Sequence, residues 1–521
     1  MTLPYSVFPP RGPARARVLL PTGYAGSTAS YPVIYLLHGA GDNPCAWTTS
    51  DDGQVPLEQF TAQREAQGER VIVVMSDGGG GNYAANGDRD AAGWYSNWCN
   101  PNSAGVCRFG APAWETFHVE QLVAYVESHF RARPGRENRV VAGLSMGGFG
   151  SLSYAARHPD MFVSAYSFSG FANVDGLPFL EPTALAALQS RNNTPDARVW
   201  GDYTTNEVAW RGHNPADLAG NLRDLQRVWL RTGEGVAGGP APDDGDPVGL
   251  VTEGAVSLTN HSFVVDATAA GLNPTYVPYP MGGHNWWHWQ DDLHTAWPLM
   301  MADLAARPAP PAAFDYCSTE PAFSVWGWDV SATRTAAEFL SLQGAGRSGL
   351  TLRGSGAVTV ATPAAYTAGA VYTVAATPLT TVPVTSAAGS NASASLTDPC
   401  VTPQVLARGA PQVQTAVAGP DGRLRFAITL GPAHAQQQFT PGERATETAT
   451  PGYWQTLAVA ITAGAGPAGG PGAAGGATPN TAGSAPAGPW APLALVAAIA
   501  ALVRREGARS RRSHASRPGP A

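Results

Sequence analysis

The chain has 521 residues, a formal net charge of −7 and only 14% charged residues, and its 32 basic side chains are all arginine. Without a basic stripe in the part expected to fold, the sequence gives no electrostatic basis for binding nucleic acid. Five cysteines with no C-x-x-C spacing argue against a zinc site. The length exceeds what one hydrophobic core usually serves, so we expect two or three domains.

Residues 1–305 alternate between strand-like and helical runs. Strand patterns recur at residues 32–37, 71–75, 140–141, 163–167, 228–230 and 275–279, and helical patterns at residues 115–131, 151–158, 262–271 and 291–305. Strands that alternate with helices are typical of a mostly parallel sheet with helices on its faces. We therefore predict an α/β domain over residues 1–305.

A different pattern follows a proline-rich linker at residues 306–313. Residues 314–462 alternate threonine and valine with Gly and Pro punctuation, most clearly at residues 350–360. This pattern predicts a smaller all-β, sandwich-like domain. It contains no catalytic constellation, so we expect a spacer or a module that contacts cell wall or glycan.

The C-terminal sequence predicts attachment to a membrane or cell wall. Residues 463–489 are a flexible Gly/Ala/Pro-rich linker, and the hydrophobic residues 490–503 precede a basic tail at residues 504–521, as at the inner end of an anchor. The apolar run is shorter than the roughly 20 residues of a spanning helix, so a disordered hydrophobic tail is the alternative. Residues 478–482 resemble a sortase signal in which Thr478 replaces leucine.

The N-terminus shows no signal peptide. Either the true start lies upstream or the protein is cytoplasmic, and the C-terminal segment favours the first, hence an extracellular protein. For such a protein we expect disulfides Cys99–Cys107 and Cys317–Cys400, with Cys45 left as a thiol. Five buried thiols are the alternative.

Ser145 lies in the run Gly143-Leu144-Ser145-Met146-Gly147, between a β-branched strand pattern and a helical one. A G-x-S-x-G pentapeptide in this context predicts a nucleophile elbow, a sharp turn that exposes the serine hydroxyl. Cβ atoms at Gly143 and Gly147 would clash in such a turn. The N–H of Met146 would point to the same space as the hydroxyl and form half of an oxyanion hole.

Two further motifs supply candidate partners for Ser145. His284 follows a strand pattern and the pair Gly282-Gly283, and tryptophans follow it, so it can act as a general base shielded from water. Upstream, a buried strand enters His38-Gly39-Ala40, whose backbone N–H groups, Ala40 above all, would complete the oxyanion hole.

Together these motifs make residues 17–304 resemble the putative-esterase family of α/β hydrolases. The matching segments are residues 19–24, 35–39, 94–98, 143–148, 200–202 and 284–289. That family holds esterase D-like enzymes, feruloyl and acetylxylan esterases and the mycobacterial mycolyltransferases. Residues 95–98 and 284–289 are most similar to the mycolyltransferases, whereas His38 and Gly147-Gly148 are most similar to the plain esterases. The resemblance implies an α/β-hydrolase fold in which Trp98 and Trp286 lie beside the substrate.

The acid partner of His284 has several candidates. Glu234, Glu253 and Asp266 all lie between Ser145 and His284, and so does a cluster of aspartates at residues 243–246. The cluster lies in Gly/Pro-rich sequence typical of a solvated loop, and Asp266 is placed mid-helix. The resemblance implies a glutamate about one helix before the strand that leads to the histidine. We therefore assign Glu253.

The sequence thus predicts a serine carboxylic-ester hydrolase that forms an acyl-enzyme on an extracellular small-molecule or cell-wall polysaccharide ester, with no cofactor and no metal. One alternative is an acyltransferase of mycolyltransferase type, in which a sugar hydroxyl accepts the acyl group. Another is a non-catalytic surface binding protein on a hydrolase scaffold.

Overall fold

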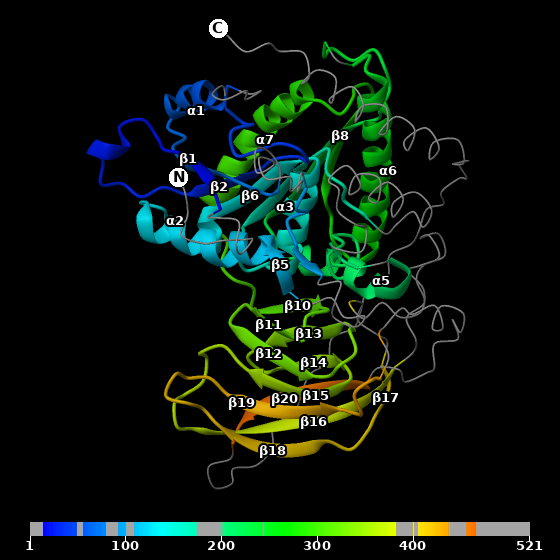
Figure 1. Cartoon of the computed structure of the whole chain (residues 1–521). Helices are drawn as coiled ribbons and strands as arrows, with labels where there is room; N and C mark the ends of the chain where they lie inside the picture. The colour runs from blue at the N-terminus through cyan, green and yellow to red at the C-terminus, as the bar shows by residue number, and fades with distance from the viewer. Residues whose placement is uncertain are drawn as a thin grey trace.

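A computed structural model describes most of the expected α/β part and much of the region after it. The described residues are 14–48, 56–79, 92–99, 109–174, 199–381 without 202 and 243, 400, 405–435, 437 and 455–464. Figure 1 shows an α/β part above and a smaller all-β part below.

The α/β part is built on a seven-stranded sheet in which all neighbouring strands except the first pair are parallel. In spatial order its strands are β1 (Ala16–Leu19), β3 (Ile72–Ser76), β2 (Val33–Leu37), β6 (Arg139–Leu144), β7 (Ser164–Phe168), β8 (Arg227–Gly233) and β9 (Thr275–Tyr279). β1 runs antiparallel to β3. A sheet of this kind carries its functional side chains at the carboxyl ends of the strands.

Helices cover both faces of this sheet because its strands bury side chains on both sides. Along β2, Tyr35 and Leu37 enter one hydrophobic core, and Ile34 and Leu36 enter the other. The first core is completed by side chains from the π-helix Thr116–Leu122, α2 (Val123–His129), α3 (Met146–Arg157), α5 (Tyr203–Arg211) and α6 (Pro247–Ala269). The second is completed from α1 (Leu57–Glu65) and α7 (Trp286–Ala306).

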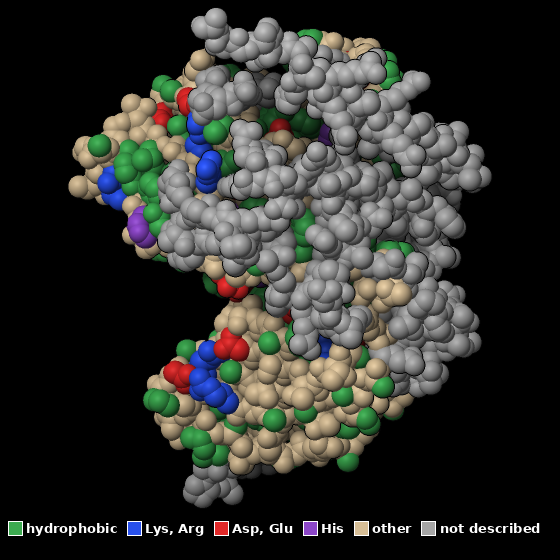
Figure 2. Space-filling model, viewed as in Figure 1, with side chains coloured by type: hydrophobic (Ala, Val, Ile, Leu, Met, Phe, Trp, Pro, Cys, Tyr) green, Lys and Arg blue, Asp and Glu red, His purple; other side chains and the backbone are tan. Residues whose placement is uncertain are grey.

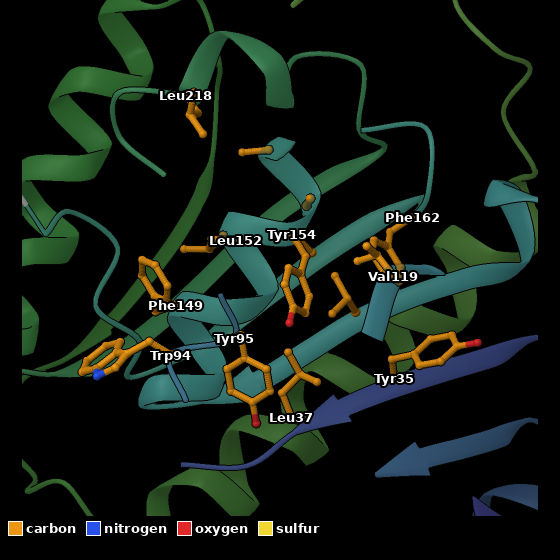
Figure 3. Close-up of a cluster of buried hydrophobic side chains, with 14 of the residues drawn as sticks. Tyr35, Leu37, Trp94, Tyr95, Val119, Phe149, Leu152, Tyr154, Phe162 and Leu218 are labelled. Carbon is orange, nitrogen blue, oxygen red and sulfur yellow. The ribbon is translucent and has the colours of Figure 1, made fainter. Parts of the chain in front are cut away.

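The first core extends under the helix that follows Ser145. Figure 3 shows Phe149, Leu152 and Tyr154 of α3 near Trp94 and Tyr95, with Leu37 of β2 beside Tyr95. The Trp94 ring contacts Phe149 edge-on, with their centroids 5.6 Å apart. The segment 92–98 therefore packs against α3, and Tyr95 also bonds the turn after β2. A short antiparallel pair, β4 (Asn97–Cys99) and β5 (Phe109–Ala113), extends from this segment.

The second region consists of two antiparallel sheets. The larger contains β10 (Ala313–Ser318), β13 (Leu340–Gly346), β14 (Gly349–Gly354), β20 (Gln455–Ala463), β16 (Val371–Thr381) and β17 (Val405–Arg408), with β18 (Gln412–Val417) also paired to β16. The smaller contains β11 (Ala322–Val325), β12 (Trp328–Thr333), β15 (Gly356–Ala361) and β19 (Arg425–Leu430). Side chains from both sheets share one hydrophobic core, as in a β-sandwich.

The run 350–360, in which the β pattern of the sequence is clearest, is divided between the two sheets. β14 ends at Gly354 in the larger sheet, and β15 starts at Gly356 in the smaller one. Gly356 has a φ of 80°, which glycine adopts without strain, so the chain turns there from one sheet to the other.

The two parts are joined by buried polar contacts. Asn221 exchanges two hydrogen bonds with the backbone of Cys317, at 2.9 and 3.0 Å. Arg157 of α3 pairs with Glu320 at 2.8 Å. Cys317 belongs to the core of the α/β part and forms the expected disulfide with Cys400.

Some of the other sequence predictions concern described residues, and some concern residues outside them. Cys45 is a half-buried thiol, while Cys107 lies outside the described residues, so its pairing with Cys99 stays a prediction. The sortase-like segment, the apolar run 490–503 and the basic tail also lie outside them. Within the described ranges, no helix is long and apolar enough to cross a membrane.

Candidate active site

Ser145 occupies a strained turn between β6 and α3, with φ 52° and ψ −118°. A Cβ atom on Gly143 would lie 2.3 Å from the carbonyl oxygen of Gly147, and one on Gly147 would lie 2.5 Å from that of Leu37. Both positions therefore require glycine, as the sequence predicted. The strain is of the kind that a packed scaffold sustains at functional sites.

His284 lies between β9 and α7 and bridges Ser145 to Glu253. Its Nε2 is 2.8 Å from Ser145 Oγ, and its Nδ1 is 2.7 Å from Glu253 Oε2. A carboxylate accepts hydrogen bonds, so the Nδ1–H tautomer donates to Glu253 and leaves Nε2 to accept from the serine hydroxyl. The backbone N–H of His284 donates to Gly249 O at 3.0 Å, which ties the histidine to the α6 helix that carries Glu253.

Glu253 lies on α6 and is fully buried. Its Oε1, the carboxylate oxygen that does not face His284, accepts three hydrogen bonds. Oε1 accepts hydrogen bonds from Ser169 Oγ at 2.7 Å, Thr232 Oγ1 at 2.8 Å and Gly233 N at 2.6 Å. These donors come from the carboxyl ends of β7 and β8, and β7 is the neighbour of β6, the strand that ends just before Ser145. They fix the carboxylate so that Oε2 faces the imidazole.

The turn after β2 lies against Ser145. A Cβ atom on Gly39 would be 3.4 Å from Ser145 Cβ, so the backbone of this turn passes close to the serine. Ala40 lies in the turn, and Met146 is the first residue of α3, where backbone N–H groups have no partner within the helix. The structure thus brings both predicted oxyanion segments to Ser145.

His38 holds the turn after β2 from inside. Its Nε2 accepts a hydrogen bond from Gly78 N at 3.0 Å, its Nδ1 is 2.8 Å from Gly39 O, and Tyr95 Oη donates to its carbonyl at 2.9 Å. Burial lowers the pKa of His38 to about 4, despite the hydrogen bond to Gly39. The ring is therefore neutral near pH 7, and Nε2 remains an acceptor. Burial also raises the pKa of the neighbouring Asp42 to about 7.

The tryptophans near His284 form an edge-to-face cluster. The His284 ring contacts Trp289 at a centroid distance of 4.8 Å, Trp289 contacts Trp286 at 5.3 Å, and Trp286 contacts Trp47 at 5.2 Å. Trp286 is half-buried beside the histidine. Trp98, by contrast, is 3% exposed, and its indole N–H donates to Gly93 O, so it is a core residue of segment 92–98 with little surface to offer a substrate.

A family model described as "Putative esterase" matches residues 11–300, more than half of the chain. The chain belongs to this esterase family. An esterase of Mycobacterium tuberculosis H37Rv, Esterase Rv1288, is 42% identical over 270 residues that cover 51% of this chain and 51% of that protein. This esterase-family chain therefore spans about half the length of that relative.

More distant relatives carry another activity in their names. The diacylglycerol acyltransferase/mycolyltransferase Ag85A of Mycobacterium leprae is 28% identical over 287 residues, which cover 54% of this chain and 78% of the relative. Among solved structures, MPT51 of Mycobacterium tuberculosis is 21% identical and covers 58% of this chain and 97% of its own, with a TM-score of 0.42.

Sequence reasoning missed several residues of this esterase-family site. Ser169 and Thr232, which bond Glu253, could have been found as polar residues at the carboxyl ends of neighbouring parallel strands. The start of α6 was also missed, although Asp246 caps it by accepting from Gly249 N and Pro247 follows at the first helical position. The helix predicted at residues 262–271 is the C-terminal part of α6.

The expectation that the aspartates at 243–246 form a solvated loop was wrong for Asp244. Asp244 is buried, and the four hydrogen bonds that its carboxylate accepts, one of them from the side chain of His288, offset the cost of burying it. Asp246 is exposed, and Asp243 lies outside the described residues. Among the described residues, no group of His, Cys, Asp and Glu side chains could hold a metal ion.

Proposed function

We propose that this chain is a serine carboxylic-ester hydrolase that works through an acyl-enzyme, with Ser145, His284 and Glu253 as its catalytic residues. The observation that carries the proposal is the unbroken chain of hydrogen bonds from Ser145 Oγ through His284 to the buried carboxylate of Glu253. Membership of the esterase family supports it independently.

The geometry leads to a two-step reaction. Ser145 Oγ attacks the ester carbonyl carbon while its proton passes to His284 Nε2. His284 then protonates the alcohol oxygen as the ester C–O bond breaks, which leaves an acyl group on Ser145. A water molecule gives its proton to Nε2 and attacks the acyl carbon, and the carboxylic acid leaves as Ser145 regains its proton.

Charge is stabilised at two places during this reaction. The ionised Glu253 faces Nδ1 and stabilises the imidazolium that forms on each proton transfer. We assign the stabilisation of the negative charge on the carbonyl oxygen to the backbone N–H groups of Ala40 and Met146. These groups require no rearrangement, because both segments are already packed against Ser145. Trp286 supplies an apolar wall for the substrate beside His284.

A second candidate is acyl transfer to a sugar hydroxyl. The similarity to the diacylglycerol acyltransferase/mycolyltransferase Ag85A of Mycobacterium leprae, which extends over 78% of that protein, favours it. The first half of the reaction is common to both activities. The two differ only in whether water or an alcohol attacks the acyl-enzyme.

The test is release of p-nitrophenol from short-chain acyl esters by the full chain, with and without an added sugar. Ser145→Ala should abolish release, since loss of the nucleophile costs as much as loss of the whole triad. Ser128→Ala, which removes an exposed hydroxyl on α2 with only local hydrogen bonds, should leave release unchanged.

Three outcomes separate the candidates. Release that is independent of sugar supports the hydrolase, and formation of acylated sugar at the expense of free acid supports the transferase. No release by the wild-type chain, and no reaction of Ser145 with a fluorophosphonate, would leave a non-catalytic binding protein.

We also propose that the protein is extracellular and attached through residues 490–503. The disulfide between Cys317 and Cys400 supports an oxidising compartment, and the abrupt arginines after the apolar run support an anchor. Deletion of residues 490–521 from a chain exported with a signal peptide should move esterase activity from cells to medium with unchanged turnover. Identical partition of both chains would show that the segment is no anchor.

A further inference from the structure

A second imidazole–carboxylate pair lies next to the catalytic histidine. His288 Nε2 is 2.8 Å from Asp244 Oδ1, and both residues are only 3% exposed. Because the carboxylate accepts, the proton lies on Nε2 of His288. The His288 ring stacks on Tyr279 at the end of β9, with ring centroids 4.7 Å apart. A Cβ atom on Gly282 would lie 2.5 Å from His288 Nε2, so the glycine leaves space for this ring.

Asp244 bonds to the chain on both sides of His284. Its Oδ1 accepts from Gly283 N at 2.9 Å, immediately before the histidine, and from Asn285 Nδ2 at 3.2 Å, immediately after it. Its Oδ2 accepts from Ala241 N at 2.9 Å. Burial alone would raise the pKa of Asp244, but the hydrogen bonds from Gly283, His288 and Ala241 together lower it. The carboxylate is therefore ionised when it makes these bonds.

The bonds to Asp244 restrict the segment in which His284 lies. Asn285 also caps α7, where its side chain accepts from Trp287 N and His288 N at 3.1 and 3.3 Å. The segment around His284 is thus held at three points. Asp244 accepts from the backbone of Gly283, Gly249 O accepts from the backbone of His284, and Asp244 accepts again from the side chain of Asn285. An imidazole that must lie within hydrogen-bond distance of both a serine and a glutamate needs its main chain fixed in this way.

We propose that Asp244 and His288 are positioning residues that set the approach of His284 to Ser145. This inference rests on the proposed esterase function and assigns to the pair no contact with substrate. His288 donates one hydrogen bond to the carboxylate, and Asp244 transmits that restraint to Gly283 and Asn285. Loss of either residue should shift His284 relative to Ser145 and reduce the rate of proton transfer.

The key comparison is between two variants of His288. His288→Leu removes the donor, whereas His288→Gln can place its amide Nε2–H where the imidazole Nε2–H was. His288→Leu should reduce kcat for p-nitrophenyl ester hydrolysis by about 10- to 100-fold, the cost of a misplaced catalytic group. KM should change by less than about twofold, because substrate contacts remain. His288→Gln should recover most of kcat.

Asp244→Asn gives an independent test. Its amide nitrogen must face either the three donors at Oδ1 or the N–H of Ala241, so one donor meets another donor. Its kcat should fall as in His288→Leu. The control is Asp246→Asn, which removes a neighbouring carboxylate but keeps the helix cap, since asparagine caps as well as aspartate. Its kcat should match that of the wild type.

The rate at which a fluorophosphonate labels Ser145 gives a second readout, because labelling needs the same proton transfer to His284. Labelling should slow in proportion to kcat/KM in His288→Leu and Asp244→Asn. The inference is overturned by wild-type kcat in folded His288→Leu or Asp244→Asn, or by an equal loss in His288→Gln and His288→Leu. If His288→Leu does not fold, His288→Gln and Asp244→Asn decide. A wild-type chain without hydrolysis or labelling would instead refute the proposed function.

Discussion

At the scale of single residues, the candidate site depends on how each carboxylate is surrounded. Glu253 accepts bonds from Ser169, Thr232 and Gly233 in addition to His284, and no water is needed to satisfy it. Glu234, the other glutamate considered for the same role, is partly exposed and bonds Ser257. A buried acid that is held by several donors keeps one orientation, which is what the imidazole requires.

Glu253→Gln should therefore reduce kcat strongly, by about 10²- to 10⁴-fold, as loss of the analogous charge does in serine proteases. The amide would place an NH₂ group against either His284 Nδ1–H or the three donors at Oε1. Glu234→Gln should stay within about twofold of the wild type. Steady-state hydrolysis of p-nitrophenyl esters measures both, and the reverse pattern would move the acid role to Glu234.

At the scale of elements, α6 and the turn before it orient two members of the site. Glu253 lies on α6, and Gly249 O of the same helix accepts the backbone N–H of His284. Gly235, in the loop between β8 and α6, has a φ of 67°, and a Cβ atom there would lie 2.4 Å from Leu250 O. This close approach fixes the loop against the first turns of the helix.

Two glycines near this contact should respond in opposite ways to alanine. Gly254, inside α6, has its nearest foreign atom 3.8 Å from a built Cβ, so Gly254→Ala should stabilise the fold by about 0.5–1 kcal/mol through helix propensity. Gly235→Ala should destabilise it by at least about 1 kcal/mol through strain and collision. Urea unfolding measures both, and stabilisation by Gly235→Ala would contradict the close approach of loop and helix.

At the scale of the whole molecule, Arg157 connects the α/β part to the β-sandwich. The buried guanidinium pairs with Glu115 at 2.7 Å and Glu320 at 2.8 Å and donates to Gly212 O at 2.6 Å. Elsewhere on the surface, Figure 2 shows the charged side chains of the described parts in small groups, with acidic and basic residues close together on the β-sandwich. Loss of the buried ion pairs of Arg157 should reduce the stability of the protein more than loss of an exposed ion pair on the surface.

Arg157→Met should destabilise the protein by about 3–5 kcal/mol, because Glu115 would remain buried, and Glu320 partly buried, without the guanidinium that pairs with both. Arg425→Met is the matched control, since Arg425 pairs with Asp421 on an exposed surface, and it should leave the free energy of unfolding close to that of the wild type. Thermal or urea unfolding of the full chain measures both. Equal effects of the two substitutions would show that the junction does not depend on Arg157.

The sequence by itself determined those features that depend on local steric and hydrophobic pattern. The strand at residues 275–279 and the serine elbow with its two required glycines follow from short segments whose residue types leave few alternatives. The esterase-type fold followed from the order of such segments. Local sequence could also name Glu253, but only through the resemblance, because nothing adjacent to it in the chain marks it as buried.

Only the tertiary structure decided which distant polar groups meet. Ser169, Thr232 and Gly233 reach Glu253 from two strands, and Asp244 is buried although its neighbours Pro242 and Gly245 are typical of a solvated loop. Likewise, the run 350–360 divides between two sheets because β14 pairs with the distant β20 and β15 with the distant β19. In each case contacts between segments far apart in the sequence stabilise the observed arrangement, and local propensity carries no information about these contacts.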